Sequence, residues 1–277
     1  MSSLSSQDPS SSAAAPKVNK DLINRGVYKT NVAGIATFTV LRALDPLLQY
    51  KLLKPSGGWG TSLLTKLGIS TASFPSSFLV TLGSLTLPLP QAILLAMAVG
   101  SSLKQIFWVT YINNEEFTPA ISASVSAYNS VVNSLDSLLL LAAGTSAALL
   151  APTYTNGLTL PIAIGASLYA VGITLETVSE IQRKQFKDDE ANKGKICTTG
   201  FWGLARHINY GGYTLWRTGM CLAGGGWTAG AGMLAWHLWT FLARSTVLMD
   251  EYMTDKYKGQ WVKYKTDVPY KLFPGIY

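Results

Sequence analysis

The stretch that decides the fold is residues 211–249, GGYTLWRTGMCLAGGGWTAGAGMLAWHLWTFLARSTVLM, where only Arg217 and Arg244 carry a charge. This apolar region is 39 residues long, whereas a helix needs roughly 20 to cross a bilayer. Gly224, Gly225 and Gly226 stand at its middle, and consecutive glycines favour a break in a helix. We therefore predict a hairpin of two membrane helices.

The rest of the chain is also poor in charge. Charged residues make up 13% of the 277 residues and hydrophobic ones 48%, whereas a soluble domain carries about 25% charged residues. Further apolar segments occupy residues 31–53, which Arg42 and Asp45 interrupt, and 73–89, 91–112, 125–151 and 158–178. The pattern predicts an all-α fold, a polytopic membrane bundle of about five to seven transmembrane helices.

Polar segments divide the chain. Residues 1–30 are predicted to be a disordered polar tail, residues 31–178 hold the N-terminal membrane helices, and residues 179–277 form the C-terminal domain. In that domain, lysine and arginine outnumber acidic residues in the 180–205 loop and in the tail after residue 249. The positive-inside rule puts both on the cytosolic face. There we expect them to close on each other.

Composition excludes several classes of protein. Two histidines cannot build a histidine-rich iron site, and two cysteines cannot build a four-cysteine zinc site, so we expect no metal. The net charge of +7 comes without a block of basic residues, which favours cytosolic loops over nucleic-acid binding. The expected partners are membrane lipids and a lipid-like small molecule. No pattern indicates an oligomeric state.

The densest polar cluster lies at the start of the predicted hairpin, with Arg206, His207, Asn209 and Tyr210 within five residues. Such donors at a membrane boundary suit an anionic ligand such as a pyrophosphate or a carboxylate. The alternative is an interfacial anchor that contacts lipid headgroups. Upstream, Glu176 lies inside an apolar segment, where an ionisable group is usually functional.

A polar stripe lies in the 125–151 segment. Asn129, Asn133 and Asp136 are spaced i, i+4 and i+7 and share one face of a helix. Hydrogen bonding between helices is favoured over substrate binding, with Lys104 as a candidate partner.

Three ordered blocks carry a resemblance to a known family. They are Glu176–Lys187 (ETVSEIQRKQFK), Gly200-Phe-Trp with Arg206–Gly212 (RHINYGG), and Asp250–Tyr264 (DEYMTDKYKGQWVKY) with Val268–Tyr277 (VPYKLFPGIY). Together they resemble the C-terminal domain of the steroid 5-alpha-reductase-like superfamily, and the tail is similar to that of the sterol reductases. The resemblance covers about residues 172–277.

The resemblance implies an NADPH-dependent reductase of a carbon–carbon double bond in a steroid, sterol or terpenoid-like lipid, resident in the endoplasmic reticulum membrane. Carried over by position, it nominates as cofactor-binding residues Glu180, Gln182, Arg183, Arg206, His207, Asn209, Tyr210, Asp250, Glu251, Tyr257, Trp261, Tyr264 and Tyr270. A buried acid would protonate or polarise the end of the alkene that does not receive the hydride. The candidate acids, in order, are Tyr210, Tyr128 and Asp136.

The sequence departs from the family pattern at three positions of the loop. Ile208 replaces a proline, Gly211 an aromatic residue and Tyr213 a glutamate. A histidine-arginine pair that precedes the Asp250-Glu251 pair in the sterol reductases is also missing. These departures keep a non-catalytic member of the fold as an alternative.

A second alternative is a membrane methyltransferase that uses S-adenosylmethionine, of the isoprenylcysteine or phospholipid type. That family carries an Arg-His-Pro-x-Tyr loop, similar to residues 206–210 here except for Ile208, and it also carries a C-terminal carboxylate pair. The ending at residues 268–277 favours the reductase.

Overall fold

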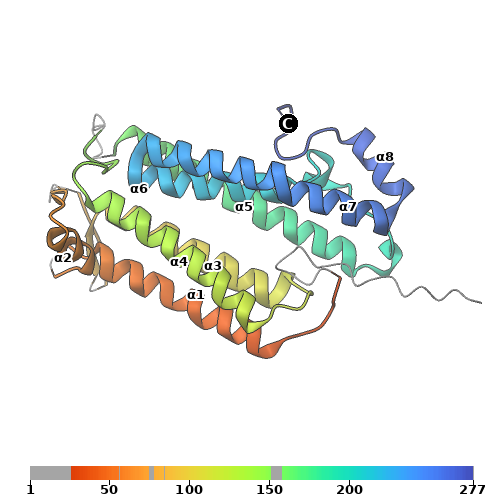
Figure 1. The fold of residues 1–277 in the computed structure, drawn as a ribbon, viewed down its shortest axis with the longest axis horizontal. Coiled ribbons are helices and arrows are strands. Elements are labelled where there is room, and N and C mark those ends of the chain that lie inside the picture. The colour runs from red at the N-terminus through yellow and green to blue at the C-terminus, as the bar shows by residue number, and fades with distance from the viewer. Residues whose placement is uncertain (1–25, 56, 75–77, 84, 151–157, 277) are drawn as a thin grey trace, which may run out of the picture.

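The structure is a computed structural model that describes residues 26–55, 57–74, 78–83, 85–150 and 158–276. Figure 1 shows an elongated helical bundle, with α1, α3 and α4 along one side and α5, α6 and α7 along the other. The long helices are α1 Val32–Leu53, α3 Leu89–Phe107, α4 Pro119–Leu141, α5 Leu160–Asp188 and α6 Ile208–Thr240. The shorter ones are α2 Trp59–Lys66, α7 Thr246–Tyr257 and α8 Gly259–Asp267. Single turns are η1 Trp108–Ile112, η2 Glu190–Asn192, η3 Gly200–Gly203 and η4 Phe241–Ser245.

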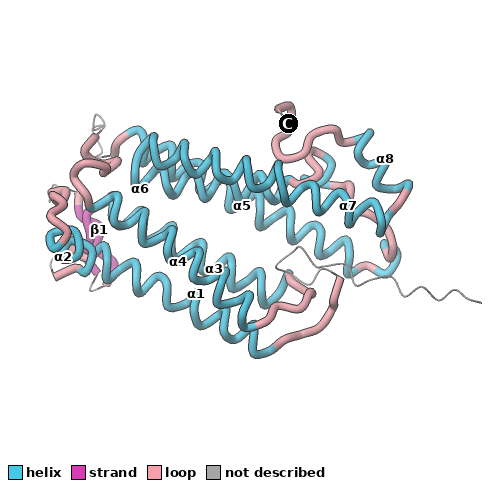
Figure 2. The backbone as a smooth tube through the Cα atoms, in the orientation of Figure 1, coloured by secondary structure: helices cyan, strands magenta, loops and turns pink. Residues whose placement is uncertain are grey.

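The predicted helical architecture is confirmed, except that the 125–151 segment is helical only as far as Leu141 and the 73–89 segment contains strands. Within the 73–89 segment, strand β1 Leu79–Leu82 pairs antiparallel with β2 Leu85–Pro88 instead of forming a membrane helix. Gly83 takes a φ of 60° at the turn and Pro88 precedes α3, so both ends of β2 oppose a continuous helix. Figure 2 shows the strands at the end of the bundle opposite α8.

Two helices in the described part of the chain are long and apolar enough to cross a membrane. They are Leu89–Ile112 and Leu160–Asp188. The other long helices carry buried polar side chains that lower their hydropathy. The number of five to seven membrane helices therefore stays a prediction.

The hairpin predicted from the glycine triplet is present within α6. Gly226 has φ 71° and ψ −163°, which no helix accommodates, and it separates two arms of α6. The arms pack against each other, since the Tyr210 ring stacks on Phe241 at 4.8 Å and Tyr213 meets His237 at 5.2 Å. The chain therefore reverses at Gly226 and brings residues 237–241 back to the start of the hairpin.

A seam of glycines lets α5 and the first arm of α6 pack closely. A Cβ atom built on Gly172 would lie 2.4 Å from the Trp216 nitrogen, and one on Gly165 would lie 2.5 Å from the Gly219 carbonyl oxygen. Both neighbours are backbone atoms that cannot rotate away. Only glycine therefore fits at these two positions.

Gly172→Ala is expected to destabilise the protein by about 1–3 kcal/mol, because the added methyl must separate two packed helices. The matched control is Gly232→Ala in the second arm, where an added Cβ meets nothing within 4 Å. That control should be neutral or stabilising, since alanine is the better helix former by about 1 kcal/mol. Melting temperatures in detergent test this, and equal values for the two variants would contradict the seam.

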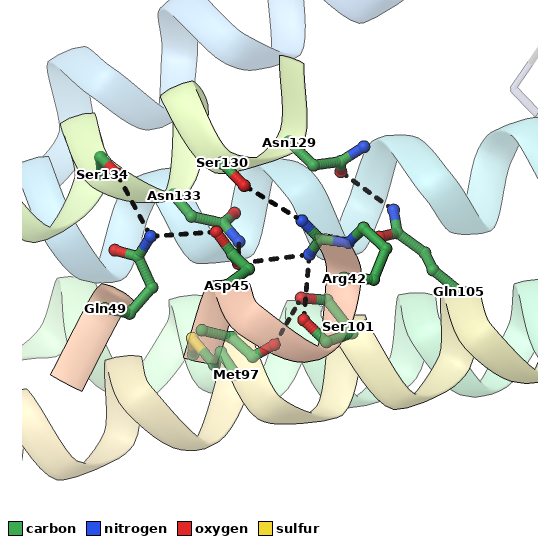
Figure 3. Close-up of polar contacts among 12 residues, drawn as sticks. Arg42, Asp45, Gln49, Met97, Ser101, Gln105, Asn129, Ser130, Asn133 and Ser134 are labelled. Atoms are coloured by element: carbon green, nitrogen blue, oxygen red, sulfur yellow. Dashed lines mark hydrogen bonds and ion pairs between the residues drawn. The ribbon is translucent and has the colours of Figure 1, made fainter. Parts of the chain in front are cut away.

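A buried polar network links α1, α3 and α4 (Figure 3) and extends to α6 through Arg217. The Asp45 carboxylate of α1 accepts hydrogen bonds from Arg42 at 3.2 Å, from Gln49 at 3.2 Å and from Asn133 of α4 at 2.6 Å. Arg217 of α6 donates to the Asn133 side-chain oxygen at 2.7 Å and also to Asn129. The predicted role of Asn129 and Asn133 in bonding between helices is confirmed.

The sequence suggests Lys104 as a partner of the polar stripe of α4, but the structure places it elsewhere. It forms an ion pair with Glu176 of α5, whose second carboxylate oxygen accepts from Trp216 Nε1 at 2.6 Å. Glu176, expected to be functional because it lies in an apolar segment, thus has two structural partners.

Candidate cofactor site

A cleft of about 550 Å³ opens where the end of α5, the start of α6, α7 and α8 meet, at the right in Figure 1. This volume lies within the usual range of small-molecule sites. Most of the cofactor residues carried over from the resemblance line it, namely Glu180, Arg183, Arg206, His207, Asn209, Tyr210, Tyr257, Trp261 and Tyr264. The fold therefore gathers residues from three separate sequence blocks around one space.

Four nominated residues do not line the cleft. Gln182 accepts a hydrogen bond from the Phe201 backbone N–H at 2.9 Å, and Asp250 accepts one from Trp261 Nε1 at 2.8 Å. Glu251 is exposed. Tyr270 is also exposed, and its carbonyl oxygen accepts from the Arg206 N–H at 3.0 Å. The Asp250 bonds to Trp261 and Lys265 lower the pKa of its carboxyl, although partial burial opposes them.

Glu180 links two other residues that line the cleft, Arg183 and Asn209. Its carboxylate accepts from Arg183 Nη2 and from Asn209 Nδ2, both at 2.6 Å, and the residue is 4% exposed. Because the carboxylate is buried and accepts from both the Arg183 guanidinium and the Asn209 amide, it fixes the positions of these two side chains. Asn209 is therefore held by α5 and oriented along the cleft wall.

Arg206 binds the C-terminal tail. Its Nη1 donates to three backbone carbonyls, those of Lys265 at 3.3 Å, Val268 at 2.6 Å and Pro269 at 3.1 Å. The His207 N–H donates to the Lys271 carbonyl at 2.7 Å. Arg206 was nominated as a cofactor contact, and the structure adds a second role, docking the tail against the cleft.

His207 offers the cleft a neutral aromatic ring. Burial lowers the pKa of His207 to about 4, and the adjacent Arg206 charge acts in the same direction. The ring stacks on Tyr210 at 5.4 Å and meets Trp261 edge-on at 6.3 Å. Flat rings at this end of the cleft suit stacking against a planar ligand.

The three lysines that line the cleft, Lys184, Lys187 and Lys256, were not nominated from the sequence. Lys187 Nζ donates to the Tyr257 hydroxyl at 2.9 Å and to the Lys195 carbonyl, and Lys256 Nζ donates to Tyr28 at 3.1 Å and Tyr252 at 2.8 Å. Both ammonium groups lie over the Tyr257 ring, 4.9 and 5.6 Å from its centre. Among the described residues neither lysine forms an ion pair. The basic end of the 176–187 block was the available signal for Lys187.

The N-terminal strap, residues 26–31, covers part of the cleft. The Gly26 N–H donates to Glu115 Oε1 at 3.0 Å, the Glu116 N–H donates to the Val27 carbonyl at 2.9 Å, and Tyr28 lines the cleft. The strap follows a tail that carries no motif, so nothing in the sequence indicated its position.

The three candidate acids lie in different places. Tyr210 lines the cleft. Asp136 is 2% exposed and its backbone abuts Gly224 beside the hairpin turn, roughly 21 Å along the first arm from Tyr210 at 1.5 Å per residue. Tyr128 of α4 lies outside the cleft and contacts His237, a residue that the sequence analysis did not nominate.

Comparisons with known proteins identify the family of the chain. Residues 126–268 match the family described as "Protein of unknown function (DUF1295)". The chain belongs to this family, which is part of the steroid 5-alpha-reductase-like superfamily. The resemblance stated from the sequence is thereby confirmed.

Two kinds of relative point to different chemistry. "Probable O-methyltransferase ustE" of Ustilaginoidea virens is 32% identical over 258 residues, 90% of this chain and 88% of that protein. The 7-dehydrocholesterol reductase of Danio rerio is 32% identical over 93 residues, which cover 34% of this chain and 20% of the reductase. The Delta(14)-sterol reductase ERG24B of Gibberella zeae is 26% identical over 166 residues and covers 42% of this chain and 34% of that protein. The chain thus spans between a fifth and a third of these two reductases.

Proposed function

We propose that the protein is a membrane-embedded, NADPH-dependent reductase of a carbon–carbon double bond in a sterol-like or other terpenoid-like lipid. The proposal includes residence in the endoplasmic reticulum membrane, with the 180–205 loop and the C-terminal tail in the cytosol. Similarity to the sterol reductases supports the reaction class. The choice of NADPH over S-adenosylmethionine as the cofactor is based on the charge of the cleft.

The cleft lining holds five cations and three carboxylates. Two carboxylates have cationic partners, since Glu180 binds Arg183 and Asp188 binds Lys184 at 2.8 Å. Lys187 and Lys256 bind neutral oxygens. Two adjacent ammonium groups with neutral partners fit the phosphates of a dinucleotide, whereas they repel the sulfonium cation of S-adenosylmethionine.

In this proposal the lysines hold phosphate, and His207 and Trp261 at the aromatic end of the cleft flank a flat ring. Bound NADPH would supply a hydride. Asn209, fixed by Glu180, would orient the ligand by its remaining amide groups. The residues that line the cleft on the α7 and α8 side, such as Tyr257 and Tyr264, would exclude water from it.

The test is a thermal-shift and affinity titration of the purified protein with NADPH and with S-adenosylmethionine. NADPH should give a saturable shift. Lys187→Gln and Lys256→Gln should each raise the Kd for NADPH about tenfold, equivalent to one charge-assisted contact. Lys263→Gln is the matched control, because this lysine of α8 is exposed and pairs with Asp267 outside the cleft. A shift with S-adenosylmethionine alone would contradict the proposal.

Turnover is measured with two probes taken from the names of the relatives, 7-dehydrocholesterol and a Δ14-unsaturated sterol. Reduction of either one, with oxidation of NADPH, supports the proposal. Binding of NADPH without reduction of either probe would favour the non-catalytic alternative, and Tyr213→Glu would then be compared for a gain of turnover.

O-methyl transfer is the second candidate function, favoured by the relative from Ustilaginoidea virens that covers most of both chains. It requires S-adenosylmethionine to bind the same cleft despite its excess of cations. Transfer of a labelled methyl group to a lipid extract, with no NADPH-dependent reduction, would establish it.

A further inference from the structure

A tyrosine and a histidine meet between α4 and the second arm of α6, outside the cleft. The Tyr128 hydroxyl lies 3.5 Å from His237 Nε2, and His237 Nδ1 lies 3.1 Å from the Met233 carbonyl oxygen. Because a carbonyl can only accept, Nδ1 carries a hydrogen. In the neutral ring Nε2 is then the acceptor, and the Tyr128 hydroxyl donates to it. The backbone of α6 thus fixes which nitrogen faces Tyr128.

The side chain of Phe241 separates this pair from Tyr210, which lines the cleft. Tyr210 lines the cleft and stacks on Phe241 at 4.8 Å, and Phe241 contacts His237 at 5.8 Å. Tyr213, which stands where the resemblance places a glutamate, packs edge-on against His237 at 5.2 Å. The hairpin turn at Gly226 is what returns His237 to this position.

The two side chains differ in access. His237 is 2% exposed, whereas Tyr128 is 38% exposed on the outer side of α4. In a membrane that outer side faces lipid. Tyr128 can therefore be reached by a lipid substrate, while His237 behind it is shielded.

The other two candidate acids are less well placed. Both faces of the Tyr210 ring are covered, by His207 and by Phe241. Asp136 is buried beside the hairpin turn, far along the arm from the cleft. Tyr128 combines access from the lipid with a contact between its hydroxyl and a second proton carrier, His237.

We infer that Tyr128 is the catalytic acid of the reduction and that His237 is the residue that positions it and returns its proton. This inference rests on the proposed function. When His237 Nε2 is protonated, the direction of the hydrogen bond between the two side chains reverses. The imidazolium then donates to the Tyr128 oxygen, and the phenol proton is free to point toward the substrate.

The step balances with groups already named. The O–H bond of Tyr128 would break and a C–H bond would form at one alkene carbon, and bound NADPH would supply the hydride for the other alkene carbon. The Nε2 proton passes to the phenolate, and the imidazole is reprotonated from water. One double bond, one NADPH and one proton are consumed, and the saturated product and NADP⁺ are formed.

The first test needs no cofactor or substrate. The chain has two histidines, His207 and His237, so ¹⁵N-histidine labelling gives two side-chain spin systems, and His237→Gln assigns them by deleting one. We expect His237 to show the Nδ1–H tautomer, and Tyr128→Phe to shift its Nε2 resonance while leaving that of His207 in place. An Nε2 resonance of His237 that Tyr128→Phe does not move would overturn the contact and with it the inference.

The second test is turnover of the two sterol probes. Tyr128→Phe and His237→Leu should lower kcat by about 10²–10⁴-fold, the usual contribution of a general acid, with the Kd for NADPH unchanged. His237→Gln keeps an amide oxygen that can accept from Tyr128 and should recover at least about tenfold over His237→Leu. The matched control is Tyr169→Phe, whose hydroxyl donates to the Met97 carbonyl at 2.7 Å, and its kcat should match that of the unaltered protein.

The outcomes separate this inference from the proposed function. An active unaltered protein with an equally active Tyr128→Phe variant would overturn the inference and leave the proposed function standing. An unaltered protein that reduces neither probe would overturn the proposed function, and the acid role with it.

Discussion

Replacing Asp45 with leucine is expected to destabilise the protein by about 3–5 kcal/mol, the cost of leaving one member of a buried ion pair without its partner. The side chains of Asp45 and Arg42 are both fully buried. Asp45 also accepts from Gln49 and Asn133, so its removal takes an acceptor from two buried donors. Melting temperature and unfolding in mixed detergent micelles measure the effect.

The double variant Arg42→Met with Asp45→Leu tests the physical reason. Because both charges leave together, most of the lost stability should return, even though the pair is absent. Asp267→Leu is the surface control, since its pair with Lys263 is exposed and should contribute no more than about 0.5 kcal/mol. A double variant as unstable as Asp45→Leu would show that the hydrogen bonds of Arg42, to Ser102 at 3.0 Å for example, matter more than its charge.

The sequence predicted the hairpin because local chemistry determines it. Three consecutive glycines within an apolar region leave few alternatives, and Gly226 does adopt a backbone conformation that only glycine takes readily. The 73–89 segment was wrongly assigned because hydropathy does not separate a short apolar strand pair from a helix. Its Gly83 turn was the better signal.

Arg42 and Asp45 made the 31–53 segment ambiguous for a physical reason. A charged residue lowers the mean hydropathy of a segment regardless of whether its partner is water or another side chain. Here the partners are Asn133, 88 residues away, and Ser102. Periodicity on α4 indicated that a polar face existed, but no local pattern could identify α1 as the helix that meets it.

The sequence predicted most of the candidate-site residues that lie within motifs and missed those that lie outside them. Asn209, Tyr210 and Trp261 belong to the blocks that carry the resemblance, and they line the cleft. Tyr28 and His237 reach their positions only because the chain folds back over long distances, so no pattern within their own segments indicated them. The roles of all these residues stay predictions that the variants above test.

Arg206→Ala is expected to undock the C-terminal tail and abolish cofactor binding as a consequence. Its Nη1 serves three carbonyls of residues 265–269, and the residue is 9% exposed. Leaving buried carbonyls without donors costs about 1–3 kcal/mol each, so we expect a loss on the order of 3 kcal/mol or more. Trp261 and Tyr264, which lie just before residues 265–269 and line the cleft, would lose their support.

Hydrogen exchange of residues 268–276, measured beside the Kd for NADPH, separates tail docking from direct ligand contact. Arg206→Ala should raise exchange in that segment even without ligand, and Arg206→Lys should restore part of the protection, because an ammonium group can reach some of the same carbonyls. The matched comparison is Asn209→Ala, which removes the 2.6 Å bond to Glu180 and touches no tail residue. It should weaken NADPH binding while the tail stays protected. If Arg206→Ala weakened NADPH binding with the tail still protected and the melting temperature unchanged, the guanidinium would act on the ligand itself, and the three carbonyl bonds would be incidental to stability.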